Sequence, residues 1–226
     1  MRRLVGDNGG TNARFALVED SGRPTDERTL AVADHAGLAE AALAYLGGRT
    51  VDEAVLAVAT PVETDEVHFT NSPWSFSITA LSRALGLTRL AVINDFVAQA
   101  LAVTLLDERD LERLTAGLAL ADRPIAVIGP GTGLGVAGLV PLAGHWVPLA
   151  TEGGHASLAP GNARELAVLQ RLGGHWPHIS KERLVSGPGL LTLARGIFDI
   201  GDRTCPAATP EGVAREAAKG GPGLPG

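Results

Sequence analysis

The first half of the chain alternates short apolar runs with segments of helical periodicity. Residues 4–7 and 13–18 are apolar runs on either side of a glycine-rich turn, a pattern typical of a β-hairpin. The continuous apolar runs at residues 54–59 and 90–93 predict two buried strands. Helices are predicted around these strands, over residues 36–46, 79–85 and 96–106. Strands that alternate with helices in this way predict an α/β fold with a mixed central sheet.

The second half repeats the opening arrangement of strand, glycine-rich turn and strand. Residues 125–128 and 135–140 are the predicted strands, and residues 129–133 form the turn between them. Helices are predicted over residues 163–172, 189–198 and 210–219, the last one capped by Thr209. Six of the seven residues at 220–226 are glycine or proline, so we expect this tail to be disordered.

A charged segment at residues 107–113 separates these two halves. A polar connection of this kind predicts a boundary between two lobes. We therefore expect a small amino-terminal lobe, residues 1–108, and part of a larger lobe, residues 109–226. Each lobe is expected to contain one glycine-rich turn.

The composition is typical of a folded protein and excludes several classes of function. The chain has 226 residues, 45% of them hydrophobic and 19% charged, which is enough to bury a core. Its formal net charge is -6 and its basic residues do not cluster, so we expect no nucleic acid partner. Cys205 is the only cysteine, which excludes an internal disulfide and a multi-thiolate zinc site. No apolar run is long enough for a signal peptide or a membrane span, which predicts a cytoplasmic protein.

The two glycine-rich turns are candidates for phosphate binding. Glycine lets backbone N–H groups point into one concavity, where they bind anionic oxygens, and Thr11 and Thr132 each add a hydroxyl. Asp7 is the only carboxylate in the first turn, and we interpret it as a candidate magnesium ligand. Each turn by itself is equally typical of a tight hairpin without a ligand. The presence of two such turns makes the phosphate interpretation more specific.

Two common nucleotide-binding motifs are excluded by their context. Residues 133–138 satisfy the pattern G-x-G-x-x-G, but in a dinucleotide-binding fold this pattern opens a helix, whereas a strand is predicted here. Neither turn ends in the Gly-Lys-Ser/Thr of a Walker A loop. Phosphate transfer by this chain would therefore use different groups.

Asn94 and Asp95 lie at the end of a predicted buried strand and directly before a predicted helix. Polar side chains at this position of an α/β fold project into the ligand crevice. An aspartate there can accept the proton of an attacking hydroxyl. The alternative is that Asn94 or Asp95 only caps the helix that begins at Phe96, and the residues alone favour this alternative.

A carboxylate and an imidazole, Glu152 and His155, are separated by two glycines. Both can face one small polar ligand, because glycine lets the backbone fold tightly and leaves space for the ligand. Carboxylate oxygens accept hydrogen bonds from neighbouring sugar hydroxyls, and a neutral histidine donates one bond and accepts another. A solvated surface loop is an equal alternative, whereas a metal site is disfavoured because only two ligands are present. Glu182 cannot be distinguished from a solvated helix residue in this way.

Six motifs in order resemble the bacterial glucokinase family, which belongs to the hexokinase, actin and Hsp70 ATPase superfamily. They are GDNGGTNARF at residues 6–15, Thr70-Asn71 with Trp74, INDF at 93–96, GPGTGLG at 129–135, EGGH at 152–155 and ERLVSGPG at 182–189. Asn8 departs from the family, in which an aliphatic residue is usual at this position. Members of the family also continue well beyond this length, so we expect a chain shortened at its C-terminus, with an incomplete second lobe.

The resemblance implies an α/β, two-lobed actin-like ATPase fold of the ribonuclease H-like type. It also implies transfer of the γ-phosphoryl group of ATP to the 6-hydroxyl of glucose, the first step of glycolysis, with Mg2+ beside Asp7. The implied phosphate-binding residues are Gly6, Asp7, Asn8, Gly9, Gly10, Thr11, Gly131, Thr132 and Gly133. The implied glucose-binding residues are Asn94, Asp95, Glu152, His155 and Glu182, with Asp95 as the catalytic base.

Three other functions are compatible with parts of this sequence. A non-catalytic sugar-binding remnant or regulator would keep the glucose residues without phosphoryl transfer. A sugar kinase of the related repressor-and-kinase family is disfavoured because those proteins carry a cysteine-rich zinc motif. An acyl-phosphate kinase gives no role to the segment at residues 152–155. The sequence does not determine whether other hexoses or other phosphoryl donors are used, or whether two chains form a homodimer.

Overall fold

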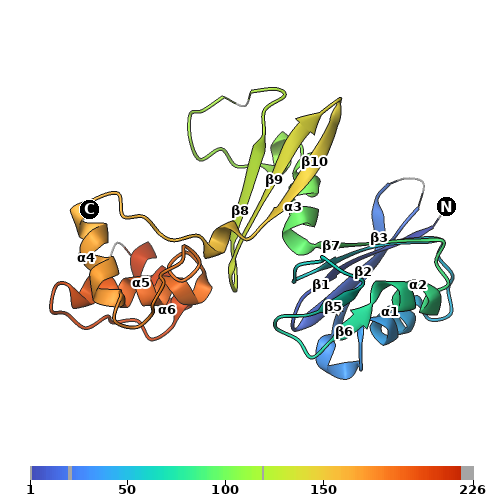
Figure 1. Cartoon of the computed structure of the whole chain (residues 1–226), viewed down its shortest axis with the longest axis horizontal. Helices are drawn as coiled ribbons and strands as arrows, with labels where there is room; N and C mark the ends of the chain where they lie inside the picture. Colours follow the sequence, from blue (N-terminus) through green and yellow to red (C-terminus); the bar gives the residue numbers. More distant parts are fainter. Residues whose placement is uncertain (1, 20–21, 119, 220–226) are drawn as a thin grey trace. The chain divides into compact units, whose positions relative to one another are not determined.

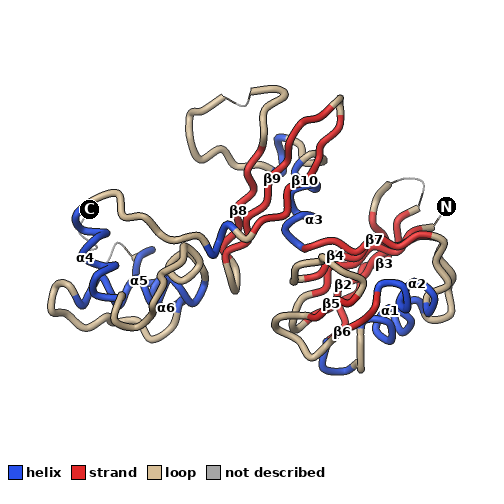
Figure 2. Tube along the Cα trace, viewed as in Figure 1, coloured by secondary structure: helices blue, strands red, loops and turns tan. Residues whose placement is uncertain are grey.

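The computed structural model describes residues 2–19, 22–118 and 120–219 (Figure 1). The chain divides into two compact units, Met1–Ala119 and Leu120–Gly226. Each unit contains one glycine-rich turn between two antiparallel strands (Figure 2). The charged segment at residues 107–113 contains one short 3-10 helix, η2 (Glu108–Asp110). The tail for which disorder is predicted lies outside the described residues.

The sheet of the first unit joins an antiparallel meander to two parallel strands. Its strands are β1 (Arg3–Asn8), β2 (Asn12–Val18), β3 (Pro24–Ala31), β4 (Glu53–Val58) and β7 (Arg89–Asn94). The order is β3, β2, β1, β4, β7, antiparallel from β3 to β1 and parallel from β1 to β7. The predicted hairpin, the mixed sheet and the buried strand β4 are confirmed. The strand predicted at residues 90–93 is confirmed as β7, but its expected burial is wrong, because β7 lies at the edge of the sheet and its residues are only partly buried. The pattern does not predict β3, because its side chains are mostly polar and almost all exposed, as suits an edge strand.

The core of the first unit lies between one face of this sheet and two helices, α1 (Leu38–Leu46) and α2 (Ile78–Ala84) (Figure 1). Side chains alternate along a strand, so core residues such as Leu4 and Leu56 point to this face, while their neighbours point to the opposite one. The third helix, α3 (Asp95–Val103), follows β7 directly and ends earlier than predicted. A short pair of strands, β5 (Glu66–His68) and β6 (Ser75–Ser77), and the 3-10 helix η1 (Val32–Asp34) complete the unit.

The second unit begins with a three-stranded antiparallel sheet in the order β10, β9, β8. Its strands are β8 (Ile125–Pro130), β9 (Leu134–Leu142) and β10 (His145–Thr151). The two predicted strands are confirmed, whereas the pattern does not predict β10, most of whose side chains are exposed. A two-residue turn joins β9 to β10, with positive φ at both Ala143 and Gly144.

Three helices and a short 3-10 helix, η3 (Gly153–His155), follow this sheet. The helices are α4 (Ala163–Leu172), α5 (Gly187–Asp199) and α6 (Pro210–Ala218). A small core joins α4 to Leu184, just before α5. Helix α5 begins two residues earlier than predicted, because Ser186 caps it by accepting a bond from the Gly189 amide. Among the described residues, no helix combines the length and the apolar character needed to cross a membrane.

Candidate active site

The first glycine-rich turn joins β1 to β2 and is packed closely against the rest of its unit. A hydrogen bond of 2.9 Å from the Gly9 amide to the Asn12 carbonyl closes the turn. A Cβ atom on Gly10 would lie 2.4 Å from the backbone oxygen of Asn71, so only glycine fits there. Thr11 is exposed, and its carbonyl accepts a bond from the Val32 amide. The turn is therefore fixed by a hydrogen bond within it and by contacts with Asn71 and Val32 outside it.

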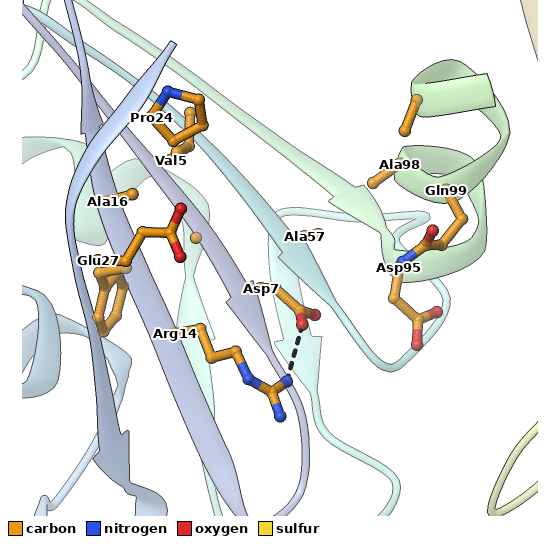
Figure 3. A pocket seen from close by; sticks show the side chains of 13 residues that line it. Val5, Asp7, Arg14, Ala16, Pro24, Glu27, Ala57, Asp95, Ala98 and Gln99 are labelled. Atoms are coloured by element: carbon orange, nitrogen blue, oxygen red, sulfur yellow. Dashed lines mark hydrogen bonds and ion pairs between the residues drawn. The ribbon is translucent and has the colours of Figure 1, made fainter. Parts of the chain in front are cut away.

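Asp7 and Arg14 face each other across the hairpin that carries this turn. They are directly opposed in the β1–β2 register, and the Arg14 Nη1 atom lies 3.0 Å from Asp7 Oδ2 (Figure 3). Both side chains point away from the core face of the sheet, into a cavity of about 320 Å³. Gln99 and Asp95 line the same cavity from α3. The structure thus brings the first turn and Asp95 to one place within the first unit.

Of the two residues Asn94 and Asp95, Asn94 is the one that caps helix α3, as the alternative interpretation of the sequence predicted. Its Oδ1 atom accepts hydrogen bonds from the amides of Phe96 and Val97, at 2.9 and 3.3 Å, and caps α3. Its Nδ2 atom donates to the Thr60 carbonyl at 3.3 Å. Asn94 therefore fixes the point where β7 becomes α3, and it leaves the neighbouring carboxylate of Asp95 on the cavity.

Asp95 has an environment that favours its protonated form. Partial burial raises the pKa of its carboxyl above the ordinary value, and the negative charge of Asp7 raises it further. A hydrogen bond from the Phe96 amide to Asp95 Oδ1, at 2.9 Å, opposes this rise. A carboxylate with a raised pKa accepts a proton more readily than an exposed one.

In the second unit, the structure brings Glu152, His155 and Glu182 together. The His155 Nε2 atom lies 3.7 Å from Glu152 Oε2, and its Nδ1 atom lies 3.8 Å from Glu182 Oε1. Both distances exceed a direct hydrogen bond, so the three polar groups converge without binding one another. This arrangement can accept and donate bonds to the hydroxyls of one small ligand.

Gly153 and Gly154 allow η3 to pack closely against β9, because neither has a side chain. A Cβ atom on Gly154 would lie 2.1 Å from the Leu134 carbonyl oxygen, and one on Gly153 would lie 2.9 Å from a methyl group of Val136. The expectation that these glycines leave space for the ligand is therefore corrected, because β9 fills that space.

The second glycine-rich turn, residues 131–133, lies between β8 and β9 and is held by groups from outside the hairpin. The Gly131 amide donates to the Gly133 carbonyl at 2.8 Å, and the Gly187 amide at the start of α5 donates to the Gly131 carbonyl at 2.7 Å. The Leu134 amide donates to Glu182 Oε2 at 2.9 Å. A strand and not a helix follows the turn, as predicted, so the dinucleotide pattern at residues 133–138 is excluded.

The residue pattern does not identify two groups that bind the predicted site residues. These are Arg14, which pairs with Asp7, and the Leu134 amide, which donates to Glu182. The signal for Arg14 was available, because in a tight hairpin a residue just after the turn is opposed to one just before it, here Asp7. The bond between the Leu134 amide and Glu182 joins residues 48 positions apart, and no local pattern predicts it.

Comparison with known families matches residues 4–223 to the family described as Glucokinase. A glucokinase of Aromatoleum aromaticum is 48% identical over 203 residues, which cover 88% of this chain and 61% of that protein. A glucokinase of Paramagnetospirillum magneticum is 42% identical over 222 residues, which cover 96% of this chain and 69% of that protein.

A solved structure is similar as well. The crystal structure of a glucokinase from an Antarctic psychrotroph matches with a TM-score of 0.85 and 36% identity, over 97% of this chain and 71% of that one. This likeness confirms the expected actin-like ATPase fold. The chain spans 61% and 69% of the lengths of the two curated relatives.

Proposed function

This chain belongs to the glucokinase family, and from that premise we propose that it transfers the γ-phosphoryl group of ATP to the 6-hydroxyl of D-glucose. The products are glucose 6-phosphate and ADP, which places the reaction at the start of glycolysis, and we propose the cytoplasm as its location. The observation that carries the proposal is the position of Asp95, partly buried at the start of α3 on the cavity that Asp7 also lines.

Asp95 is the proposed catalytic base. A sugar hydroxyl is a weak nucleophile, and a carboxylate that takes its proton as the new P–O bond forms makes the attack easier. The raised pKa of Asp95 strengthens it as a proton acceptor. The amide of Phe96, which donates to Asp95 Oδ1, holds the carboxylate in one orientation.

The residues proposed to bind the glucose hydroxyls are Asn94, Asp95, Glu152, His155 and Glu182. Two carboxylates around one imidazole supply both acceptors and a donor, as a ring of sugar hydroxyls requires. These groups fix the sugar and thereby reduce the entropy that must be lost on the way to the transition state.

The two glycine-rich turns are proposed to bind the phosphates of ATP through backbone amides. The first comprises residues 6–11 and the second residues 131–133. The first turn is braced by a hydrogen bond and by close contact of Gly10 with the Asn71 backbone, so its N–H groups need little rearrangement to meet anionic oxygens.

Asp7 is the residue proposed to hold Mg2+. Its carboxylate is 54% exposed and lies on the cavity, where Arg14 balances its charge. Within the described residues, no group of three or more His, Cys, Asp or Glu could hold a metal ion. A single carboxylate fits Mg2+, which keeps several waters and takes further ligands from nucleotide phosphates. When bound, the ion would offset negative charge on the phosphoryl oxygens.

The experiment that tests this function is a coupled assay for glucose 6-phosphate with the 226-residue chain. Asp95→Asn is expected to bind glucose nearly as well as the unsubstituted chain and to lower kcat by about 10² to 10⁴. Asp34→Asn, an exposed substitution in η1 of the same unit, is the matched control and should keep its activity. Glucose binding without any glucose 6-phosphate in the unsubstituted chain would favour a non-catalytic sugar-binding protein.

A further inference from the structure

The carboxylate of Glu182 contacts both functional segments of the second unit. Its Oε2 atom accepts the hydrogen bond from the Leu134 amide, at the end of the second glycine-rich turn. Its Oε1 atom faces the His155 ring at 3.8 Å. The backbone of Glu182 contacts the segment at residues 152–155 as well, because its amide donates to the Gly154 carbonyl at 2.9 Å.

The carboxylate of Glu182 lies directly against Gly133. A Cβ atom at this position would lie 2.5 Å from Glu182 Oε2, closer than real contacts allow, so any side chain on residue 133 must displace the carboxylate. Gly131, two residues earlier in the same turn, would meet nothing within 4 Å. The turn therefore excludes a side chain at the one glycine position that faces Glu182.

We infer that Glu182 is a positioning residue that couples sugar binding to nucleotide binding, by holding the Leu134 amide with one oxygen and the sugar with the other. This inference rests on the proposed function and adds to it a regulation of the same site. Glu182 would act on the nucleotide only through the backbone of the second turn.

The coupling is expected because the two oxygens of one carboxylate, that of Glu182, face both segments. A sugar hydroxyl that donates to Oε1 restricts the rotation of the whole carboxylate group and keeps Oε2 on the Leu134 amide. The turn is then already ordered when the nucleotide arrives, and the nucleotide binds without the entropic cost of ordering it. Coupling of binding free energies is reciprocal, so bound nucleotide must strengthen sugar binding by the same factor.

The test measures the glucose dissociation constant by calorimetry, with and without a saturating non-hydrolysable ATP analogue and Mg2+. The unsubstituted chain should bind glucose about 5 to 150 times more tightly in the presence of the analogue, the usual range of such coupling. In Gly133→Ala, glucose binding without nucleotide should weaken about tenfold, as expected for a displaced charged hydrogen-bonding group, and the coupling factor should fall to about one. Gly174→Ala is the matched control, because a Cβ there would meet nothing within 4 Å and Gly174 lies outside both binding segments, and it should keep the glucose affinity measured without nucleotide.

A second readout covers the case in which Gly133→Ala fails to fold. Saturating glucose should slow hydrogen exchange of the Leu134 amide in the unsubstituted chain, and it should not do so in Glu182→Ala. Exchange at the Gly173 amide, which donates to the Leu169 carbonyl at the end of α4 at 2.8 Å and lies outside the turn, is the internal reference.

Three results would overturn the coupling. Glucose could bind the unsubstituted chain with the same affinity whether or not the analogue is present. Gly133→Ala could keep the full coupling factor, or glucose could bind and leave the exchange at Leu134 unchanged. Each of these results leaves the proposed function intact. Failure of the unsubstituted chain to bind glucose at all would instead overturn both the proposed function and the coupling.

Discussion

The side chain of Asn8 is a polar group in an apolar core, and replacing it should stabilise the first unit. Asn8 is fully buried, and its neighbours on the core face include Leu56. Its Nδ2 atom donates to the Ala57 carbonyl at 3.0 Å, but its Oδ1 atom has no hydrogen-bond partner. The substitution Asn8→Val removes the unpartnered oxygen and places an aliphatic group in the same core.

The magnitude follows from three contributions. A buried acceptor without a partner costs about 1–3 kcal/mol, and the hydrogen bond that the substitution removes contributes about 1 kcal/mol. Burial of a valine side chain contributes about 1.5 kcal/mol or more. After allowance for imperfect packing of the new methyl groups, the first unit should gain about 1–3 kcal/mol of unfolding free energy.

Urea unfolding measures this gain if the signal comes from the first unit alone. Trp74 is buried in that unit, whereas Trp146 and Trp176 belong to the second, so the measurement uses a background in which the latter two are phenylalanine. Asn8→Val should raise the urea midpoint, and Asn8→Asp should lower it, because it buries a carboxylate. A valine variant no more stable than the parent would refute the reasoning and indicate that Oδ1 is satisfied in solution, for example by an internal water.

Two further predictions concern pH and turn geometry. Burial and the charge of Asp7 raise the pKa of Asp95 in the folded protein above the ordinary value of 3.8. The unfolded state therefore gives up this proton at a lower pH than the folded state does. As a result, the free energy of unfolding falls as the pH rises from 3.8 through the pKa of the folded protein. Asp95→Asn should therefore unfold at a higher urea concentration than the parent above that range, and a difference that persists below pH 3.8 would contradict this cause. Ala143 adopts a φ of 49° in the two-residue turn before β10, a conformation that favours asparagine over alanine. Ala143→Asn should raise stability by about 1 kcal/mol in thermal unfolding, with Leu142→Asn as a control outside the turn, and an unchanged melting temperature would contradict the expected strain.

Much of the fold could be predicted because its strands and helices are marked locally. The strands β4 and β7 are continuous apolar runs, and α4 follows the predicted bounds because Asn162 caps it and its apolar residues recur at helical spacing. Among the strands that the pattern does not predict, β3 and β10 are largely exposed, and β5 and β6 are only three residues long. An exposed strand lacks the apolar alternation that identifies a buried one, so only its pairing with a neighbour reveals it.

The sequence by itself determined which residues are available for chemistry: two glycine-rich turns, the pair Asn94 and Asp95, and the carboxylates and imidazole at residues 152–182. These are signals of residue type and spacing, which a chain carries before it folds. The tertiary structure decided how these residues are used within each unit. It assigns helix capping to Asn94, leaves Asp95 on the cavity with Asp7, and brings Glu182 to the Leu134 amide. Burial, charge proximity and long-range hydrogen bonds exist only between segments that folding brings together, and for that reason no local pattern contains them.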